Sequence, residues 1–346
     1  MPEPLLSIRD LAVEFKTDDG VVHAVDDISY DLFPSETLGI VGESGSGKSV
    51  STLSILGLIP QPPGRIVSGT AMFKGKDLLK MRKRELRSVR GDEVAMVFQD
   101  PMTSLNPVLK VGNQLGEAIK THNPKEPDGK IKTRVIDLLR LVGVPNPESR
   151  YDAYPHEFSG GMRQRAMIAM AIANSPSLLI ADEPTTALDV TIQAQVLEVL
   201  KTVQEETNAA TILITHDLGI VAELCDRVLV MYGGKIVEQG DVYTIFQNPR
   251  HPYTIGLMDS LPKLTEDEEW LRPIPGQPPS LINRPPGCAF HPRCFHSQGR
   301  LPCREQVPEL RAVDGGPDHL AACHFAEELV GHQSKFFQAA PVGGSS

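Results

Sequence analysis

The most informative segment of this chain is Gly42-Glu43-Ser44-Gly45-Ser46-Gly47-Lys48-Ser49. It fits the P-loop pattern G-x-x-x-x-G-K-S at every defined position. The apolar run Thr37–Val41 before it predicts a strand, and the apolar stretch Val50–Leu58 after it predicts a helix, as the motif requires. Backbone N–H groups of such a loop, together with the helix N-terminus, bind phosphate oxygens. The stretch therefore predicts a nucleoside triphosphate site, with Lys48 on the β- and γ-phosphates and Ser49 on Mg²⁺.

The composition and charge of the chain exclude several classes of protein. The chain has 346 residues, of which 40% are hydrophobic and 23% charged, so it can bury a packed core. Its net charge of −10 argues against a protein that holds nucleic acid by bulk positive charge. The longest apolar run, Ala166–Ala173, is shorter than the ~18 residues that a membrane span needs, and no secretory signal is visible. We expect a soluble, cytosolic chain that reaches a membrane only through a partner.

Short apolar runs alternate with helical stretches. Two alternating patterns, Leu5–Phe15 and Val25–Phe33, predict strands joined by a turn at residues 18–20. Besides Thr37–Val41, further buried strands are predicted at Val94–Phe98, Leu178–Ala181 and Thr211–Thr215. This order predicts an α/β fold with a mostly parallel sheet covered by helices.

Three other segments stand out in the pattern. The polar stretch Asp100–Pro155 is rich in helical signals and contains no strand-like run, whereas Arg227–Gly240 predicts a hairpin that turns at Gly233-Gly234. A dense Gly/Pro patch from Pro273 to Gly287 marks a change of composition. We therefore expect a core over residues 1–265 with a helical subdomain at about 100–175, a small extension over 266–334 and a flexible tail over 335–346.

Two acids end one of the predicted strands. The buried run that starts at Leu178 finishes in Asp182 and Glu183. Beside a P-loop, such a strand holds the magnesium ion through its carboxylate. We assign that role to Asp182, and Glu183 is placed to polarise the attacking water.

A second phosphate-binding pattern lies at Ser159-Gly160-Gly161-Met162, just before a predicted helix that runs to Ala173. A serine N-cap, two glycines and free N–H groups favour an anion. One chain with two phosphate-binding loops resembles the nucleotide-binding subunits of ATP-binding-cassette (ABC) transporters. In that family the signature Ser-Gly-Gly of one subunit closes over ATP bound to the P-loop of another.

The other landmarks of the family follow in the expected order. Gln99 matches the Q-loop glutamine, which contacts the metal and the attacking water, and Ala187-Leu188-Asp189 matches the D-loop at the dimer interface. His216 matches the switch histidine on the γ-phosphate, and Phe15 matches the aromatic residue that stacks on adenine. The resemblance implies these ATP contacts within one subunit: Phe15, Gly42, Glu43, Ser44, Gly45, Ser46, Gly47, Lys48, Ser49 and Val50.

The resemblance also implies a fold and a mechanism. The fold is an ABC ATPase core, with a mostly parallel sheet, an antiparallel β subdomain and a helical insert. Mg²⁺ is held through Ser49, Gln99 and Asp182, and ATP is hydrolysed in a head-to-tail dimer. Glu183 acts as the general base, oriented with the help of His216. Because both residues are present, we expect a chain that hydrolyses ATP.

Several segments point to one branch of the family. Met162 replaces the usual glutamine after the signature glycines, and this change, with residues 98–107 and His251-Pro-Tyr-Thr254, resembles the dipeptide and oligopeptide importers. That resemblance implies two transmembrane permease subunits, a second ABC ATPase (a paralogue or a second copy), an extracytoplasmic peptide-binding protein reached indirectly, and a peripheral place on the cytoplasmic face of the inner membrane. Relatives of this branch carry nickel, glutathione or murein peptides. A soluble ABC ATPase of DNA repair or translation is the alternative from another class, but such proteins usually carry two cassettes or long inserts.

Four cysteines lie close together in the C-terminal part of the chain. Their pattern is Cys288-x5-Cys294-x8-Cys303-x19-Cys323, in a segment that resembles the C-terminal extension of peptide-importer ATPases, some of which hold a 4Fe-4S cluster. Thiolates suit iron–sulfur clusters and zinc alike. No pair has the C-x2-C spacing of zinc ribbons, which favours the cluster, while zinc and unligated thiols remain open. The fifth cysteine, Cys225, is predicted to be a small buried apolar residue.

Overall fold

The computed structural model describes residues 3–100, 104–186, 188–260, 273–314 and 318–331. Ala187 of the predicted D-loop and the predicted tail 335–346 lie outside these residues. The chain divides into two compact units. The first comprises Met1–Ser7, Asp31–Thr37 and Met72–Ile214, and the second comprises Ile8–Tyr30, Leu38–Ala71 and Thr215–Ser346.

The first unit is built on three parallel strands. β7 (Leu178–Asp182) pairs with β6 (Val94–Val97) on one side and with β8 (Ala210–Thr215) on the other. Every residue of β7 and β8 is buried, which explains why both read as continuous apolar runs. All three strands match the sequence prediction to within one residue at each end.

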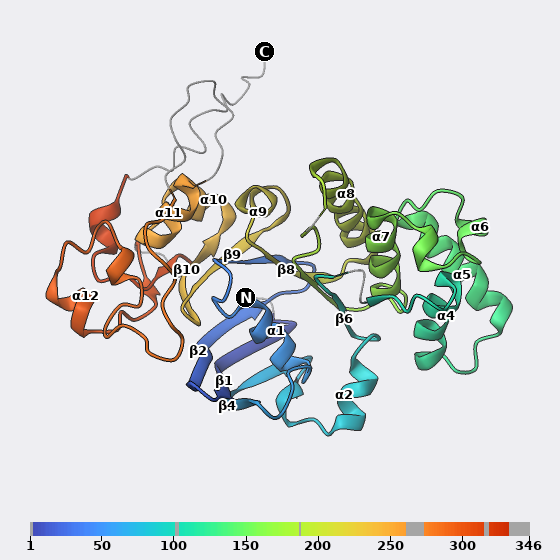
Figure 1. Cartoon of the computed structure of the whole chain (residues 1–346), viewed down its shortest axis with the longest axis horizontal. Helices are drawn as coiled ribbons and strands as arrows, with labels where there is room; N and C mark the ends of the chain where they lie inside the picture. Colours follow the sequence, from blue (N-terminus) through green and yellow to red (C-terminus); the bar gives the residue numbers. More distant parts are fainter. Residues whose placement is uncertain (1–2, 101–103, 187, 261–272, 315–317, 332–346) are drawn as a thin grey trace, which may run out of the picture. The chain divides into compact units, whose positions relative to one another are not determined.

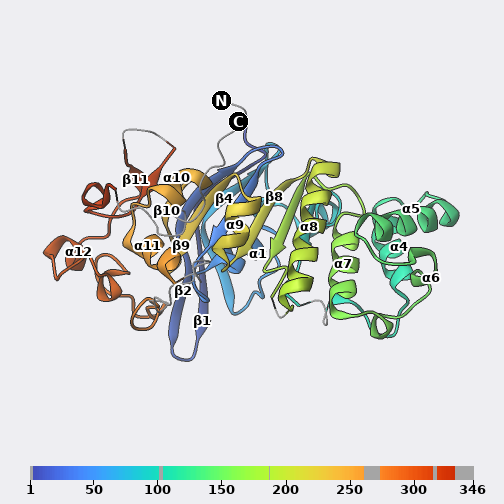
Figure 2. The ribbon, with the colours of Figure 1, turned by 90° about the horizontal axis from the view of Figure 1, so that it is seen from above.

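Helices make up most of the rest of this unit. The insert contains α4 (Val111–His122), α5 (Asp128–Leu141) and α6 (Pro147–Arg150), and no strand occurs within its described residues 104–155, as predicted. α7 (Gly160–Ala171) packs against α4, α5 and α8 (Val190–Thr207). The insert helices are drawn in green in Figures 1 and 2. Before the insert come β5 (Lys76–Asp77) and α2 (Lys83–Val89).

The second unit begins with an antiparallel layer. The long strands β1 (Leu6–Thr17) and β2 (Gly20–Leu32) lie beside β4 (Gly64–Phe73) in the order β2-β1-β4. The hairpin of β1 and β2 agrees with the prediction, whereas β4 was not anticipated. Its ten residues include two glycines and a serine and alternate only in part between buried and exposed positions. The period-2 signal of a strand is therefore weak.

A second sheet of this unit carries the P-loop. β3 (Thr37–Val41) pairs in parallel with β9 (Arg227–Tyr232), which pairs antiparallel with β10 (Lys235–Asp241). The hairpin turns at Gly233 and Gly234, both with positive φ (59° and 83°), as a tight turn of this kind requires. After the P-loop, α1 runs from Lys48 to Ile55, somewhat earlier than the predicted Val50–Leu58. It ends early because Gly57 adopts a left-handed conformation (φ 58°) that closes the helix C-terminus.

The C-terminal segment extends the same sheet. β12 (Leu320–Ala321) pairs with β10 and with β11 (Arg311–Ala312), and a small core of Val313, Ala321, Cys323 and Ala326 lies beneath. Short helices connect these strands: α9 (Leu218–Leu224), α10 (Val242–Gln247), α11 (Pro252–Asp259) and α12 (Leu301–Glu305). The sequence predicts a separate extension over residues 266–334, and that boundary stays a prediction.

Candidate nucleotide site

The P-loop lies between β3 and α1, and two of its glycines are required by sterics. Gly47, the N-cap of α1, has φ 101°, and a Cβ atom there would come within 2.3 Å of the Ala24 carbonyl oxygen. Gly42 has φ 150°, and a Cβ would come within 2.2 Å of the Met231 carbonyl oxygen. Any larger residue would push the loop off the strands behind it. Gly45, in contrast, has open space where a Cβ would lie.

The Lys48 side chain forms two hydrogen bonds within the P-loop. The side chain is 5% exposed, and its ammonium donates to the carbonyl oxygens of Gly42 at 2.7 Å and Glu43 at 3.0 Å. A lysine ammonium has three donors and no acceptor. The two hydrogen bonds to the loop carbonyls therefore hold the Lys48 ammonium inside the loop, where it can bind a phosphate group of the nucleotide.

Of the remaining predicted contacts of this unit, all except Ser46 are exposed or half-buried. Ser44 and Gly45 are exposed at the tip of the loop, while Ser46 is buried and accepts from the Gly234 amide at 3.0 Å through its carbonyl. Ser49 and Val50 are half-buried in the first turn of α1. Phe15, near the end of β1, packs its ring edge against Gly64. His216 follows β8 directly and is exposed.

In the first unit, the structure brings Gln99 and Glu183 together. The Gln99 amide nitrogen donates to the Glu183 carboxylate at 3.0 Å, and the Thr186 hydroxyl donates to the same oxygen at 2.8 Å. Glu183 itself has φ 44° and donates its backbone N–H to the Ile214 carbonyl at 2.9 Å. Asp182, the last residue of β7, is 6% exposed. Thr186 was missed in the sequence, since nothing in its local pattern distinguishes it from Thr185.

The signature segment forms the start of α7. Ser159 is the N-cap, as predicted, and its hydroxyl accepts from the Met162 amide at 3.3 Å. A Cβ atom on Gly161 would come within 2.5 Å of Cγ2 of Ile192 in α8, so only glycine allows the two helices to approach this closely. Asp189 caps α8 in the same way, accepting from the Ile192 amide at 3.0 Å. The signature and Asp189 are thus joined through one helix pair.

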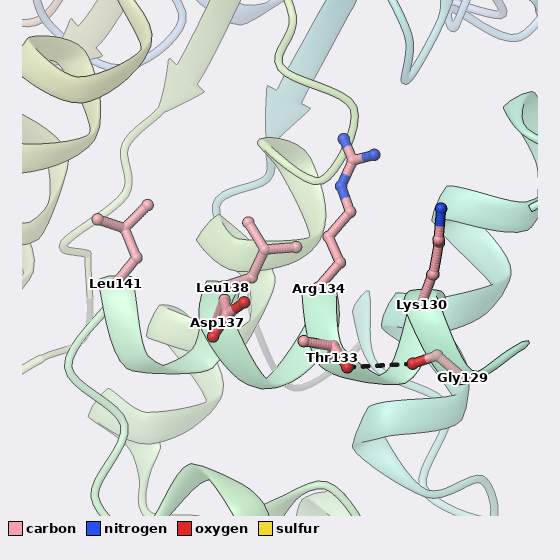
Figure 3. Close-up of a pocket in the computed structure, with 7 residues that line it drawn as sticks. All are labelled: Gly129, Lys130, Thr133, Arg134, Asp137, Leu138 and Leu141. Atoms are coloured by element: carbon pink, nitrogen blue, oxygen red, sulfur yellow. Dashed lines mark hydrogen bonds between the residues drawn. The ribbon is translucent and has the colours of Figure 1, made fainter. Parts of the chain in front are cut away.

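A wide hollow on the face of α5, from Gly129 to Leu141, is lined by none of the predicted site residues. Figure 3 shows Lys130, Arg134 and Leu138 along it, and Thr133 donating back to the Gly129 carbonyl. All of the lining residues come from this one helix.

The four C-terminal thiols line one cavity, together with Phe290 and the histidines His251, His291, His296 and His324. Burial raises the pKa of the Cys288 thiol to about 11 and that of Cys323 to about 12, and the neighbouring cysteines add to both shifts. A buried thiol with a raised pKa stays protonated at neutral pH unless a nearby cation compensates the charge of the thiolate. Among the described residues, no group of three or more His, Cys, Asp or Glu side chains is arranged to hold a single metal ion.

The histidines of this cavity already have polar neighbours. His251 Nδ1 accepts from the Tyr253 backbone N–H at 3.1 Å. His291 Nδ1 lies 2.9 Å from the Cys288 carbonyl oxygen, and His324 Nε2 lies 2.9 Å from the Gln306 carbonyl oxygen. His296 Nε2 lies 3.1 Å from a carboxylate oxygen of Glu328. Cys225 lies elsewhere, 7% exposed against Gly39, as predicted.

The sequence of the chain matches two profiles of known protein families. The profile of the ABC transporter family matches residues 25–186, and that of the oligopeptide/dipeptide transporter C-terminal region matches residues 237–303. The chain is 52% identical over 311 residues to the oligopeptide transport ATP-binding protein OppD of Bacillus subtilis, covering 90% of this chain and 86% of the relative. The chain belongs to the ABC transporter ATP-binding subunits of the oligopeptide/dipeptide family.

A second relative and a solved structure agree with this family and with the predicted fold. The dipeptide transport ATP-binding protein DppD of Escherichia coli is 51% identical over 327 residues, covering 94% of this chain and 98% of the relative. A solved ATP-binding cassette, a dimer in a post-hydrolysis state with ADP and phosphate, superposes with a TM-score of 0.61. It covers 68% of this chain and 98% of its own, at 23% identity, and shows the shared fold. The predicted ABC ATPase fold is confirmed.

As an ABC-type ATPase the chain binds and hydrolyses ATP, as predicted. None of the described helices is long and apolar enough to cross a membrane.

Proposed function

We propose that this chain is the ATP-hydrolysing subunit of a membrane ABC importer that takes up dipeptides and oligopeptides. The observation that carries the proposal is identity above 50% to transport ATP-binding proteins for these cargoes, extending through the C-terminal region. Importer ATPases for nickel, glutathione or murein peptides are the alternative cargo classes. A soluble ABC ATPase of DNA repair or translation is less favoured, because the relatives named above are transport proteins.

The proposed mechanism assigns each residue a task. Lys48, already oriented by the Gly42 and Glu43 carbonyls, neutralises the phosphate charge of ATP. Glu183 takes the proton of the attacking water, and the Gln99 and Thr186 donors hold its carboxylate in one orientation. Ser49, Gln99 and Asp182 would hold Mg²⁺, which would supply positive charge to neutralise the phosphates.

The remaining contacts come from both subunits of a dimer. Residues Ser159–Met162 of one subunit complete the ATP site of the other, with Asp189 at the dimer interface and His216 near the γ-phosphate. Phe15 stacks on adenine. The partner is either a paralogue or a second copy of this chain. The dimer is head-to-tail, because the signature of each subunit meets the P-loop of the other.

The catalytic assignment is tested with Glu183→Gln. This change keeps a side chain that can accept from Gln99 and Thr186 but removes the basic carboxylate, so we expect normal ATP binding and hydrolysis slower by about 10³-fold. The measurement is phosphate release at saturating ATP, with size-exclusion chromatography to detect a trapped dimer. Thr186→Ala is the matched control, because it removes one donor and leaves the carboxylate, and it should cost far less. Wild-type turnover in Glu183→Gln would remove Glu183 from the role of general base.

The transport assignment is tested by affinity purification of the full chain from detergent-solubilised membranes. We expect mass spectrometry to find two permease subunits and a second ABC ATPase, because the chain acts on the cytoplasmic face of the inner membrane through these partners. The peptide-binding protein should appear only when the permeases are present. Recovery of ribosomal or DNA-repair proteins alone would contradict the importer assignment.

We also propose that Cys288, Cys294, Cys303 and Cys323 hold a 4Fe-4S cluster, with zinc as the alternative. The support is that all four thiols line one cavity in a segment with few regular elements. Thiolates bound to such a centre would tie this segment together at four points.

Anaerobic purification of the full chain tests the metal centre. A cluster would give a broad absorbance near ~400 nm together with iron and sulfide in the protein. Cys294→Ser should remove the absorbance, while the matched control Cys225→Ser should keep it, because Cys225 lies outside the cavity. Colourless protein with one zinc per chain would replace the cluster by zinc, and metal-free protein would contradict both.

A further inference from the structure

The P-loop is held by a residue from the far end of the chain. The Arg293 guanidinium donates to both carboxylate oxygens of Glu43, with distances of 2.6 and 2.9 Å. The two residues are 250 positions apart in the sequence, and both belong to the second unit. Paired, parallel hydrogen bonds of this type are among the strongest that side chains make, and they fix orientation as well as distance. The contact therefore defines where Glu43, the second residue of the P-loop, lies.

Arg293 is itself rigidly placed. It is 8% exposed, and its Nε donates to the Pro275 carbonyl at 2.9 Å while Nη1 reaches the Tyr232 hydroxyl at 3.3 Å. The Glu43 carboxylate raises the pKa of Arg293 further above its usual range, so the guanidinium is charged at any working pH. Exposed ion pairs contribute little because solvent screens them, but this arginine is largely removed from solvent.

Glu43 is bound at three points, two of them from the C-terminal half of the chain. Its backbone N–H donates to the Tyr253 hydroxyl at 2.7 Å, its carbonyl accepts from Lys48, and its carboxylate accepts from Arg293. Tyr253 is fixed in turn by Tyr232, with ring centroids 4.5 Å apart. The backbone of Glu43, which orients the lysine ammonium, is thus set from outside the loop.

The charge of Glu43 adds a second effect. A carboxylate inside a phosphate-binding loop repels the phosphates, since like charges at short range disfavour each other. Arg293 neutralises that charge without occupying the loop. We propose that Arg293 is a positioning residue for the P-loop, which acts through Glu43 to set the affinity of the site for ATP. The inference rests on the P-loop being the nucleotide site.

The test measures ATP affinity of the full chain by calorimetric titration, with steady-state KM and kcat alongside. In Arg293→Ala, Glu43 is left with an uncompensated charge and one lost anchor, and we expect the Kd for ATP to rise on the order of tenfold. We expect KM to rise with it while kcat at saturating ATP stays near that of the wild type. Arg293→Lys keeps the charge but not the paired hydrogen bonds. Its Kd for ATP should lie between that of the wild type and that of Arg293→Ala.

Two further variants separate this role from general stability. The double variant Glu43→Gln with Arg293→Ala removes the charge that repels phosphate, so it should bind ATP more tightly than Arg293→Ala alone. Arg311→Ala is the matched control, because Arg311 makes the same paired contact with Glu327 at 2.6 and 2.9 Å in the same C-terminal segment, away from the P-loop. It should leave the Kd unchanged.

Defined outcomes would overturn the inference. Arg293→Ala with a wild-type Kd would do so, and so would an equal loss in Arg311→Ala, which would indicate a general effect of the segment. If Arg293→Ala does not fold, a wild-type Kd in Arg293→Lys overturns it instead. Failure of the wild-type chain to bind ATP would contradict the nucleotide site itself, which is a separate result.

Discussion

The P-loop and the signature segment are both glycine-containing loops that lead into a helix N-terminus, but they are supported in opposite ways. The P-loop is bound by side chains far away in the sequence, chiefly Arg293 and Tyr253. The signature is supported locally, since Ser159 caps its own helix and Gly161 packs against Ile192 in the next one. The conformations of the two loops therefore depend on different parts of the chain. Changes in the C-terminal half should affect binding of ATP, and changes in α7 or α8 should affect the completion of the site by a second subunit.

The largest contrast is expected between Lys48→Ala and Ser159→Ala. Lys48→Ala removes the phosphate partner and the donor that the Gly42 and Glu43 carbonyls share, so ATP affinity should fall by about a hundredfold or more. Ser159→Ala should bind ATP normally as a monomer but hydrolyse it poorly, because the proposed role of Ser159 is in the site of the other subunit.

Calorimetric titration at low protein concentration and phosphate release at high concentration measure the two effects. Unchanged ATP binding in Lys48→Ala would contradict the P-loop assignment. A loss of monomer ATP binding in Ser159→Ala would break the comparison, since it would make the signature part of the same subunit's site.

Sequence reasoning recovered the parts of this site that local pattern encodes. β3, β7 and the turn at Gly233 and Gly234 follow from uninterrupted apolar runs and from the positive φ that glycine permits. The pair of Gln99 with Glu183 could be expected only because both residues follow buried strands that lie side by side in parallel. The contact of Arg293 with Glu43 could not, since no periodicity or spacing connects residues 250 positions apart. The two-residue strands β11 and β12 are too short to show a pattern.

An intermediate effect is expected from Gly161→Ala. Alanine normally favours a helix over glycine by up to ~1 kcal/mol. Here the added Cβ would lie 2.5 Å from Cγ2 of Ile192, and overpacking of this kind costs ~1–3 kcal/mol, so the clash should win and lower the free energy of unfolding. Urea denaturation measures the loss, and the double variant Gly161→Ala with Ile192→Ala should not show an additive loss, because it removes the clashing methyl group. ATP binding to the P-loop should be unaffected in both variants, and a loss there would contradict the separation of the two loops.

The smallest effect is expected on the free energy of unfolding at low pH, through an ion pair in the C-terminal half of the chain. Arg250, which is 2% exposed, binds both carboxylate oxygens of Asp314. This contact lowers the pKa of Asp314 below its usual 3.8. A carboxyl group with a lowered folded-state pKa stabilises the fold above its unfolded pKa, and the contribution is lost as pH falls through the folded value. The wild-type chain should therefore lose additional stability below about pH 4, and Asp314→Asn should lack this dependence.

The size of that effect follows from comparing two ion pairs. Arg311 holds the pKa of Glu327 at about 2, but the Glu327 side chain is 62% exposed, whereas that of Asp314 is 34% exposed and its arginine is almost completely buried. Solvent screening reduces the contribution of the exposed pair. We expect Asp314→Asn to remove up to ~1 kcal/mol of pH-dependent stability and Glu327→Gln to remove much less. Urea denaturation at a series of pH values between about 3 and 7 measures both. A larger change in Glu327→Gln would mean that the shift itself, and not the burial of the partner, determines what an ion pair contributes to the half of the chain that holds the P-loop.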